Sequence, residues 1–237
     1  NSGLLNAHGS LHFVGEYNDV SASVAVCDNK WHHAAFVYTG HAGGSKLSLY
    51  LDGAVVKEQY ISPLETTHSP LNIGWYPLYN ANGFHVGQLD SVYVYNTALT
   101  AAQIAEVYAK DACPFPAPIA AYSFDGSLGS SLVDGLPLVA SRPLEFGTGA
   151  PVYGFTADRC GRANSALDMP SGASTYFTAA VSGLPSGSGA RSATVWVRCA
   201  PTPDFETAFL QYGIRTSNHN SGLLNAHGSL HFVGEYN

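Results

Sequence analysis

The sequence predicts an all-β protein, a sandwich or a barrel, with one short helix. Candidate strands recur at the spacing of roughly 8–12 residues that such folds show. Gly and Pro contribute 38 of the 237 residues, and Tyr and Phe contribute 25. This mixture suits short strands joined by many turns, because aromatic side chains favour strands and Gly and Pro favour turns. Helix bundles and coiled coils are therefore not expected.

The clearest strand pair is a hairpin in the first half of the chain. Lys46–Asp52 alternates leucine with polar or aromatic residues, which predicts a strand with one buried face. Asp52-Gly53 then supplies a tight turn into a second strand at Ala54–Tyr60. The other candidate strands are residues 21–26, 33–38, 71–75, 89–95, 119–124, 175–179, 192–199 and 206–212.

One helix and one linker stand out between these strands. The helix runs from Ala101 to about Tyr108, where Thr100 and Gln103 form a capping box ahead of an apolar stripe. Lys110–Pro118 follows as KDACPFPAP, and its three prolines favour an extended linker. We expect a domain to begin within this linker.

The chain contains a copy of part of itself. Residues 1–18 and residues 220–237 both read NSGLLNAHGSLHFVGEYN, at an offset of 219 residues, and each copy has the pattern of a hairpin. An arbitrary boundary of the sequence would explain the copy, but a tandem array of 219-residue units explains it better. Residues 1–112 would then be the C-terminal half of one unit, and residues 113–237 the N-terminal half of the next. Alternatively, residues 19–237 form one circularly permuted domain.

Charge limits the expected partners. Charged residues make up 11% of the chain, and the net charge of −7 comes from 17 acidic and 10 basic residues. Without a basic patch to neutralise phosphates, nucleic acid is not an expected partner. No apolar run approaches the roughly 20 residues that cross a membrane, so no membrane span is expected. Low charge also favours close contact between units, since few ions need to be desolvated.

Four cysteines suggest disulfide bonds. Cys27, Cys113, Cys160 and Cys199 are an even number in a turn-rich chain, which favours an oxidising compartment, either extracellular or at the cell surface. Three pairings are possible, and free buried thiols are the alternative.

Several segments together resemble the laminin G-like domains of the concanavalin A-like lectin/glucanase superfamily. They are Ala120–Gly126 (AAYSFDG), Gly161–Met169 (GRANSALDM), Thr194–Arg198 (TVWVR), Trp31–Tyr38 (WHHAAFVY), Leu47–Gly53 (LSLYLDG) and Gly87–Leu99 (GQLDSVYVYNTAL). In circular order they cover essentially the whole 219-residue unit. The resemblance implies a two-sheet antiparallel jelly-roll sandwich. It does not specify the function, because one scaffold hosts many kinds of site.

The resemblance also implies disulfide bonds and an ion site. A Cys27–Cys199 bridge would be similar to the pentraxin disulfide, which leaves Cys113 to pair with Cys160. Members of the superfamily often hold a structural Ca²⁺ through carboxylates and carbonyl oxygens. The matching carboxylates are Asp125, after the opening strand, and Asp90, in the closing strand. Alternatively, both are ordinary polar residues of a turn and a strand.

Aromatic side chains that bind a carbohydrate are expected here, rather than carboxylates that cleave one. A glucanase of this superfamily would need the pattern Glu-x-Asp-x-x-Glu, which is absent, so an enzyme is not expected. Trp75, Tyr76, Tyr79 and Phe84 cluster in a loop-rich stretch where they could stack on sugar rings. Alternatively, these aromatic side chains pack the sandwich or an interface between domains.

Two functions remain after these exclusions. The first is an extracellular structural or adhesive repeat that assembles into a polymer or filament through neighbouring copies of itself. The identical segments, the proline-rich joint, the cysteines and the low charge favour it. The second is a lectin-like carbohydrate-binding module. Glycans or extracellular proteins would be further partners in either case.

Overall fold

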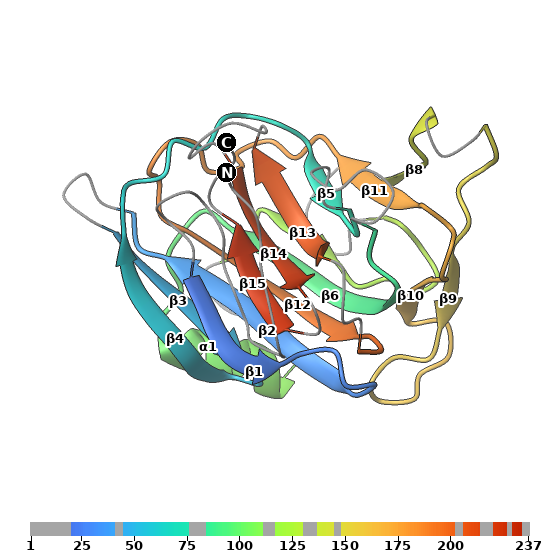
Figure 1. The fold of residues 1–237 in the computed structure, drawn as a ribbon, viewed down its shortest axis with the longest axis horizontal. Helices are drawn as coiled ribbons and strands as arrows, with labels where there is room; N and C mark the ends of the chain where they lie inside the picture. The colour runs from blue at the N-terminus through green and yellow to red at the C-terminus, as the bar shows by residue number, and fades with distance from the viewer. Residues whose placement is uncertain are drawn as a thin grey trace.

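Two antiparallel sheets pack face to face in the computed structural model of the chain (Figure 1). The structure describes residues 20–40, 45–75, 84–110, 117–129, 137–144, 148–201, 206–213, 220–226 and 229–233. These residues form antiparallel strands and, within the described part of the chain, one helix. The predicted all-β jelly-roll sandwich with one short helix is confirmed.

One sheet has seven strands. Their order is β1 (Val20–Ala25), β15 (Ser229–Val233), β14 (Asn220–Ala226), β13 (Glu206–Gly213), β5 (Leu71–Ile73), β11 (Tyr176–Ala179) and β8 (Val139–Ser141). β14 and β15 form the hairpin predicted for the second copy of the repeated segment, with Leu224 opposite His231. Both strands are interior to the sheet, because β13 lies on one side of the hairpin and β1 on the other.

The other sheet has eight strands. Their order is β4 (Ala54–Ile61), β3 (Ser45–Leu51), β2 (Trp31–Tyr38), β12 (Arg191–Arg198), β6 (Gly87–Tyr95), β10 (Ala166–Met169) and β9 (Gly154–Thr156), with β7 (Ala120–Tyr122) also paired to β6. The predicted hairpin is β3 and β4, which turn at Asp52 and Gly53. Both of these turn residues have a positive φ, which favours an Asp-Gly pair there.

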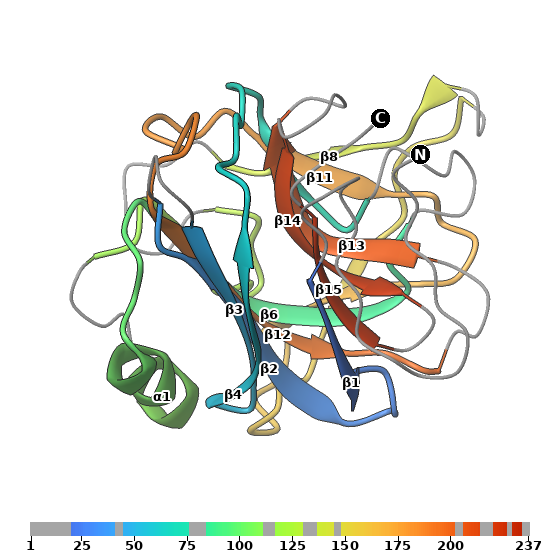
Figure 2. The same ribbon diagram turned by 60° about the vertical axis from the view of Figure 1, so that its left-hand side comes forward.

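Apolar side chains fill the space between the sheets and a second, smaller layer outside them. The main core includes Phe36, Phe177 and Phe209, all fully buried. The second cluster lies under the helix α1 (Ala101–Lys110), which covers the outer face of the eight-stranded sheet (Figure 2). Burying a large apolar side chain stabilises a fold by about 1.5–3 kcal/mol. Because α1 covers buried side chains of this cluster, the helix is part of the packed structure. The predicted capping box is confirmed: the Gln103 N–H donates to the Thr100 hydroxyl at 3.2 Å.

The two halves of the chain interleave in both sheets. β1 to β6 precede the proline-rich linker, and β7 to β15 follow it. In the eight-stranded sheet, β12 lies between β2 and β6. In the seven-stranded sheet, β5 lies between β13 and β11. Neither half of the chain therefore provides a complete sheet by itself.

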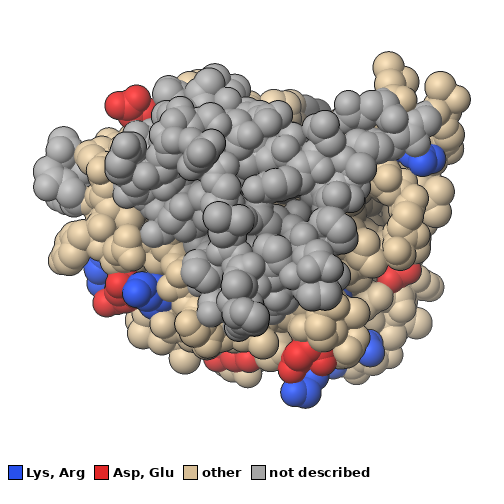
Figure 3. Space-filling model, in the orientation of Figure 1, with Lys and Arg blue, Asp and Glu red and all other residues tan. Residues whose placement is uncertain are grey.

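The charged side chains on the described surface include pairs of opposite sign. In Figure 3 some blue and red atoms adjoin one another and others stand apart, and no large patch of one sign appears on the described part of this face. Lys30 lies 2.8 Å from Asp28, and Lys46 lies 2.7 Å from Glu58. Within the described residues, no helix is long and apolar enough to cross a membrane.

Candidate functional site

An aromatic cluster lies where β5 approaches β11. Trp75 and Phe84 form an isolated β-bridge, and their rings stack with centroids 5.7 Å apart. Tyr176 of β11 adds a third ring, with its centroid 4.5 Å from that of Trp75. Two of the four side chains predicted to bind a ligand therefore come together. The other two, Tyr76 and Tyr79, lie outside the described residues.

The chain enters this cluster through a glycine whose positive φ would strain a larger residue. Gly74 has φ of 79°, and a Cβ added there would lie 2.3 Å from the Met169 side chain. Its carbonyl accepts a hydrogen bond from the His85 N–H at 2.9 Å, which closes the loop behind Trp75. Burial lowers the pKa of His85 to about 3 and keeps its imidazole neutral against Phe209.

The cluster combines packing with partial exposure. Phe84 is buried, whereas Trp75 and Tyr176 are half-buried. Stacking between the rings uses part of the area that a sugar ring would contact. Trp75 and Tyr176, which are only partly buried, are thus the members of the cluster that a ligand could reach. Tyr176 was missed from the sequence, because only the pairing of Phe177 with Ile73 brings it beside Trp75.

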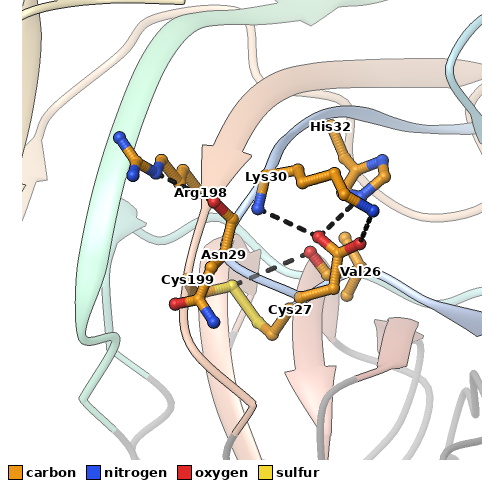
Figure 4. Close-up of a disulfide and its surroundings, with 8 residues drawn as sticks. Val26, Cys27, Asn29, Lys30, His32, Arg198 and Cys199 are labelled. Atoms are coloured by element: carbon orange, nitrogen blue, oxygen red, sulfur yellow. Dashed lines mark hydrogen bonds and ion pairs between the residues drawn. A yellow bond between two sulfur atoms is a disulfide. The ribbon is translucent and has the colours of Figure 1, made fainter.

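A buried disulfide joins Cys27 to Cys199, the pairing that the pentraxin resemblance implies (Figure 4). The cysteines are 2% and 3% exposed. The Asn29 N–H donates to the Cys199 carbonyl at 2.9 Å, and Arg198 Nε donates to the Asn29 carbonyl at 3.1 Å. The segment between β1 and β2 is thereby fixed to the end of β12 by one covalent bond and two hydrogen bonds.

Cys160 is an exposed free cysteine and does not carry the predicted bridge. Its proposed partner, Cys113, lies outside the described residues. Asp158 Oδ1 accepts hydrogen bonds from the N–H groups of Cys160 and Arg162, at 2.9 and 2.8 Å. Asp158 Oδ2 binds Arg162 Nε at 2.6 Å. These bonds close a small surface loop that presents Cys160 to solvent.

A pocket of about 330 Å³ lies beside the disulfide. Its lining includes the polar residues Asn29, Gln88, Thr156 and Arg198. Two of these polar groups already have partners within the chain: Gln88 donates to Asp168 at 2.6 Å, and Arg198 donates to Asn29. The pocket could hold a small polar group.

His32 lies between two carboxylates at the start of β2. Its Nδ1 is 2.8 Å from Asp52 Oδ2, and its Nε2 is 3.1 Å from Asp28 Oδ1. The hydrogen bond to Asp52, supported by Asp28, raises the pKa of His32 above its ordinary value. Hydrogen bonds from Lys30 and His32 lower the pKa of Asp28 to about 2. At Asp52, burial acts to raise the pKa of the carboxyl group. Hydrogen bonds from His32 and from the His33 N–H outweigh this effect and leave the pKa lowered.

Asp90 is paired with an arginine at the position expected to bind calcium. It is 1% exposed, and its Oδ2 accepts a hydrogen bond from Arg159 at 3.0 Å. The same guanidinium lies over the Trp196 ring, 4.3 Å from its centroid. Asp125 is exposed beyond the end of β7. Within the described residues, no three His, Cys, Asp or Glu side chains gather as metal ligands. Because Arg159 already neutralises Asp90, these residues do not fit the calcium site that the resemblance implies.

Comparison with known proteins gives a match to one family model. Residues 4–105 match the laminin G model described as the concanavalin A-like lectin/glucanases superfamily. The match begins inside the first copy of the repeated segment and continues through β1 to α1. No curated protein and no solved structure matches the chain. The family resemblance is thus confirmed over the matched residues.

Proposed function

We propose that this chain, whose residues 4–105 match the model of the concanavalin A-like lectin/glucanases superfamily, is a repeat module of an extracellular structural or adhesive array. The position of the repeated segment in the sheet carries the proposal. β13, β14, β15 and β1 are neighbours in that order. In an array, one continuous chain would run through these four strands, because the segment that follows β13 is identical to the segment that precedes β1.

The interleaved halves support the same proposal. A unit that begins in the proline-rich linker would contain β7 to β15, followed by the equivalents of β1 to β6. The disulfide between Cys27 and Cys199 would then lie within one unit rather than between units. In this chain the same two halves interleave in both sheets, and this supports the circularly permuted arrangement of residues 19–237. The surrounding oxidising compartment keeps such a disulfide closed.

Electron microscopy of the protein isolated from its natural source tests this function. The proposal predicts filaments or regular strings of particles, each particle the size of one sandwich. Isolated single particles at every protein concentration would contradict it.

Carbohydrate binding is a second candidate function, favoured by the contact between the partly buried side chains of Trp75 and Tyr176. A binding role is preferred over a catalytic one, because the carboxylate pattern of a glucanase is absent from the sequence. Screening the chain against immobilised glycans tests this candidate. Saturable binding to a defined sugar supports it, and the absence of any binder removes it. The two functions are compatible, since the cluster and the repeated segment involve different strands.

A further inference from the structure

We propose that the place between β13 and β1 accepts either copy of the repeated segment, so that residues 1–18 can replace residues 220–237 in the seven-stranded sheet. The chain thus carries one acceptor site and two segments of identical sequence that could fill it. This inference goes beyond the proposed array, because it concerns the single chain.

Backbone pairing with the two flanking strands, β13 and β1, defines the acceptor site. On one side, Gln211 of β13 pairs with Gly222. On the other side, Val20 of β1 pairs with Phe232, and Ser21 pairs with His231. The equivalents of these partners in the first copy are Gly3, Phe13 and His12. Since the two copies are identical, residues 1–18 can form the same ladder in the same register with the same side chains.

The two copies reach the acceptor site from opposite directions. Residues 220–237 are tethered at their start, because residues 214–219 connect them to β13. Residues 1–18 are tethered at their end, because Asp19 connects them directly to β1. If Phe13 takes the position of Phe232, it pairs with Val20. Six residues then lie between Phe13 and Val20 in the sequence. Loops of this length commonly join neighbouring elements, so the first copy needs no rearrangement of β1 to enter.

Only one copy can occupy the site at a time. The hairpin of β14 and β15 pairs with both flanking strands and leaves no room for two more strands between them. An empty site would also be costly. Val20, Phe209 and Leu210, from the two flanking strands, are fully buried, and the interior of the sheet would lose its hydrogen-bond partners. The site should therefore remain filled by one copy, and the other copy then stays outside the sheet.

Proline substitutions at equivalent positions of the two copies test the exchange in the full chain. Leu224 lies inside β14, where it pairs with both Ala208 and His231. Leu224→Pro removes an interior ladder hydrogen bond from the second copy, and Leu5→Pro does the same to the first copy. Each single substitution leaves one intact copy. The proposal predicts that each lowers the Tm by less than about 3 °C, whereas the double variant lowers it by about 10 °C or more.

Engineered disulfides then report which copy fills the site. Ser21→Cys with His231→Cys reports the second copy, and Ser21→Cys with His12→Cys reports the first. Ser21→Cys with Leu11→Cys is the control, because a shift of one residue points its side chain to the other face. Mass spectrometry measures the bridged fraction of each variant. Adding Leu224→Pro should increase the His12 bridge at least tenfold over its level without the proline, and leave the Leu11 control unchanged.

Two results would overturn the exchange. One is a Tm for Leu224→Pro as low as that of the double variant. The other is a His12 bridge that does not exceed the Leu11 control in the presence of Leu224→Pro. Either result leaves the proposed array intact, because an array needs the repeated segment only once in each unit. Conversely, isolated particles under the electron microscope would reject the array without affecting these measurements on the single chain.

Discussion

Cys27 and Cys199 are 172 residues apart in the chain and are joined by a buried disulfide between the segment that precedes β2 and the end of β12. β2 and β12 also pair along their full length, from Trp31 opposite Arg198 to Tyr38 opposite Arg191. The disulfide thus connects the two halves of the chain where they already form one sheet. It limits how far the halves can separate when the protein unfolds.

Removing the disulfide should destabilise the fold. Cys27→Ala with Cys199→Ala is expected to lower the free energy of unfolding by roughly 2–5 kcal/mol, because the bond closes a long loop. Guanidinium chloride denaturation measures the change. Cys160→Ser is the control and should have no effect, because that thiol is free and exposed. Equal stability of the double variant and the original chain would mean that the bond is absent in solution.

His32 should make stability depend on pH. Its folded-state pKa is raised, so its stabilising effect is complete below the ordinary pKa of about 6.5 and is lost as the pH rises through the raised value. The pKa values of Asp28 and Asp52 are lowered, so their effect is complete above about 3.9 and is lost as the pH falls through the folded values. The cluster therefore stabilises the fold most between about pH 4 and 6.5.

Urea denaturation of His32→Gln beside the original chain measures this contribution. The difference in the free energy of unfolding should be larger at pH 5.5 than at pH 8.5. His68→Gln is the matched control for losing a histidine, at an exposed position outside this cluster. A difference for His32→Gln that does not change with pH would contradict the role of the cluster.

Arg159 should be essential for keeping Asp90 inside the protein. Arg159→Gln leaves the carboxylate buried without its cationic partner, which should lower the free energy of unfolding by about 3–5 kcal/mol. Lys46→Gln breaks the exposed pair with Glu58 and should cost no more than about 1 kcal/mol. Thermal denaturation of the two variants compares them directly. Similar losses in both would show that Asp90 does not depend on Arg159.

Carbohydrate binding, where a glycan screen finds it, should depend on the indole of Trp75. Trp75→Ala removes the ring that stacks on Phe84 and Tyr176, and should weaken binding at least tenfold, equal to about 1.4 kcal/mol. Trp75→Phe keeps an aromatic ring and should lose less affinity. Trp31→Phe in β2 serves as the control for a general effect of tryptophan loss. Unchanged affinity in Trp75→Ala would place the sugar elsewhere.

Long strands with a regular pattern could be predicted from the sequence, whereas short ones could not. Lys46–Asp52 alternates clearly, and its strand and turn occur as expected. β8, β9 and β10 have only three or four residues, too few for alternation to distinguish them from loops. Their pairing partners, rather than their own sequences, make them strands.

The candidate site was predictable only where its members are close in sequence. Trp75 and Phe84 belong to one loop-rich stretch, so composition alone pointed to them. Tyr176 joins them through the register of β11 against β5, which no sequence pattern indicates. In the same way, Arg159 comes from a distant loop to neutralise Asp90, and its presence there removes the expected calcium ligand.

The intact mass of the reduced, denatured protein from its natural source tests the central claim most directly. An array of identical units predicts a mass several times that of one 219-residue unit. The chain described here has a mass of 25.0 kDa. A measured mass near this value would contradict the array.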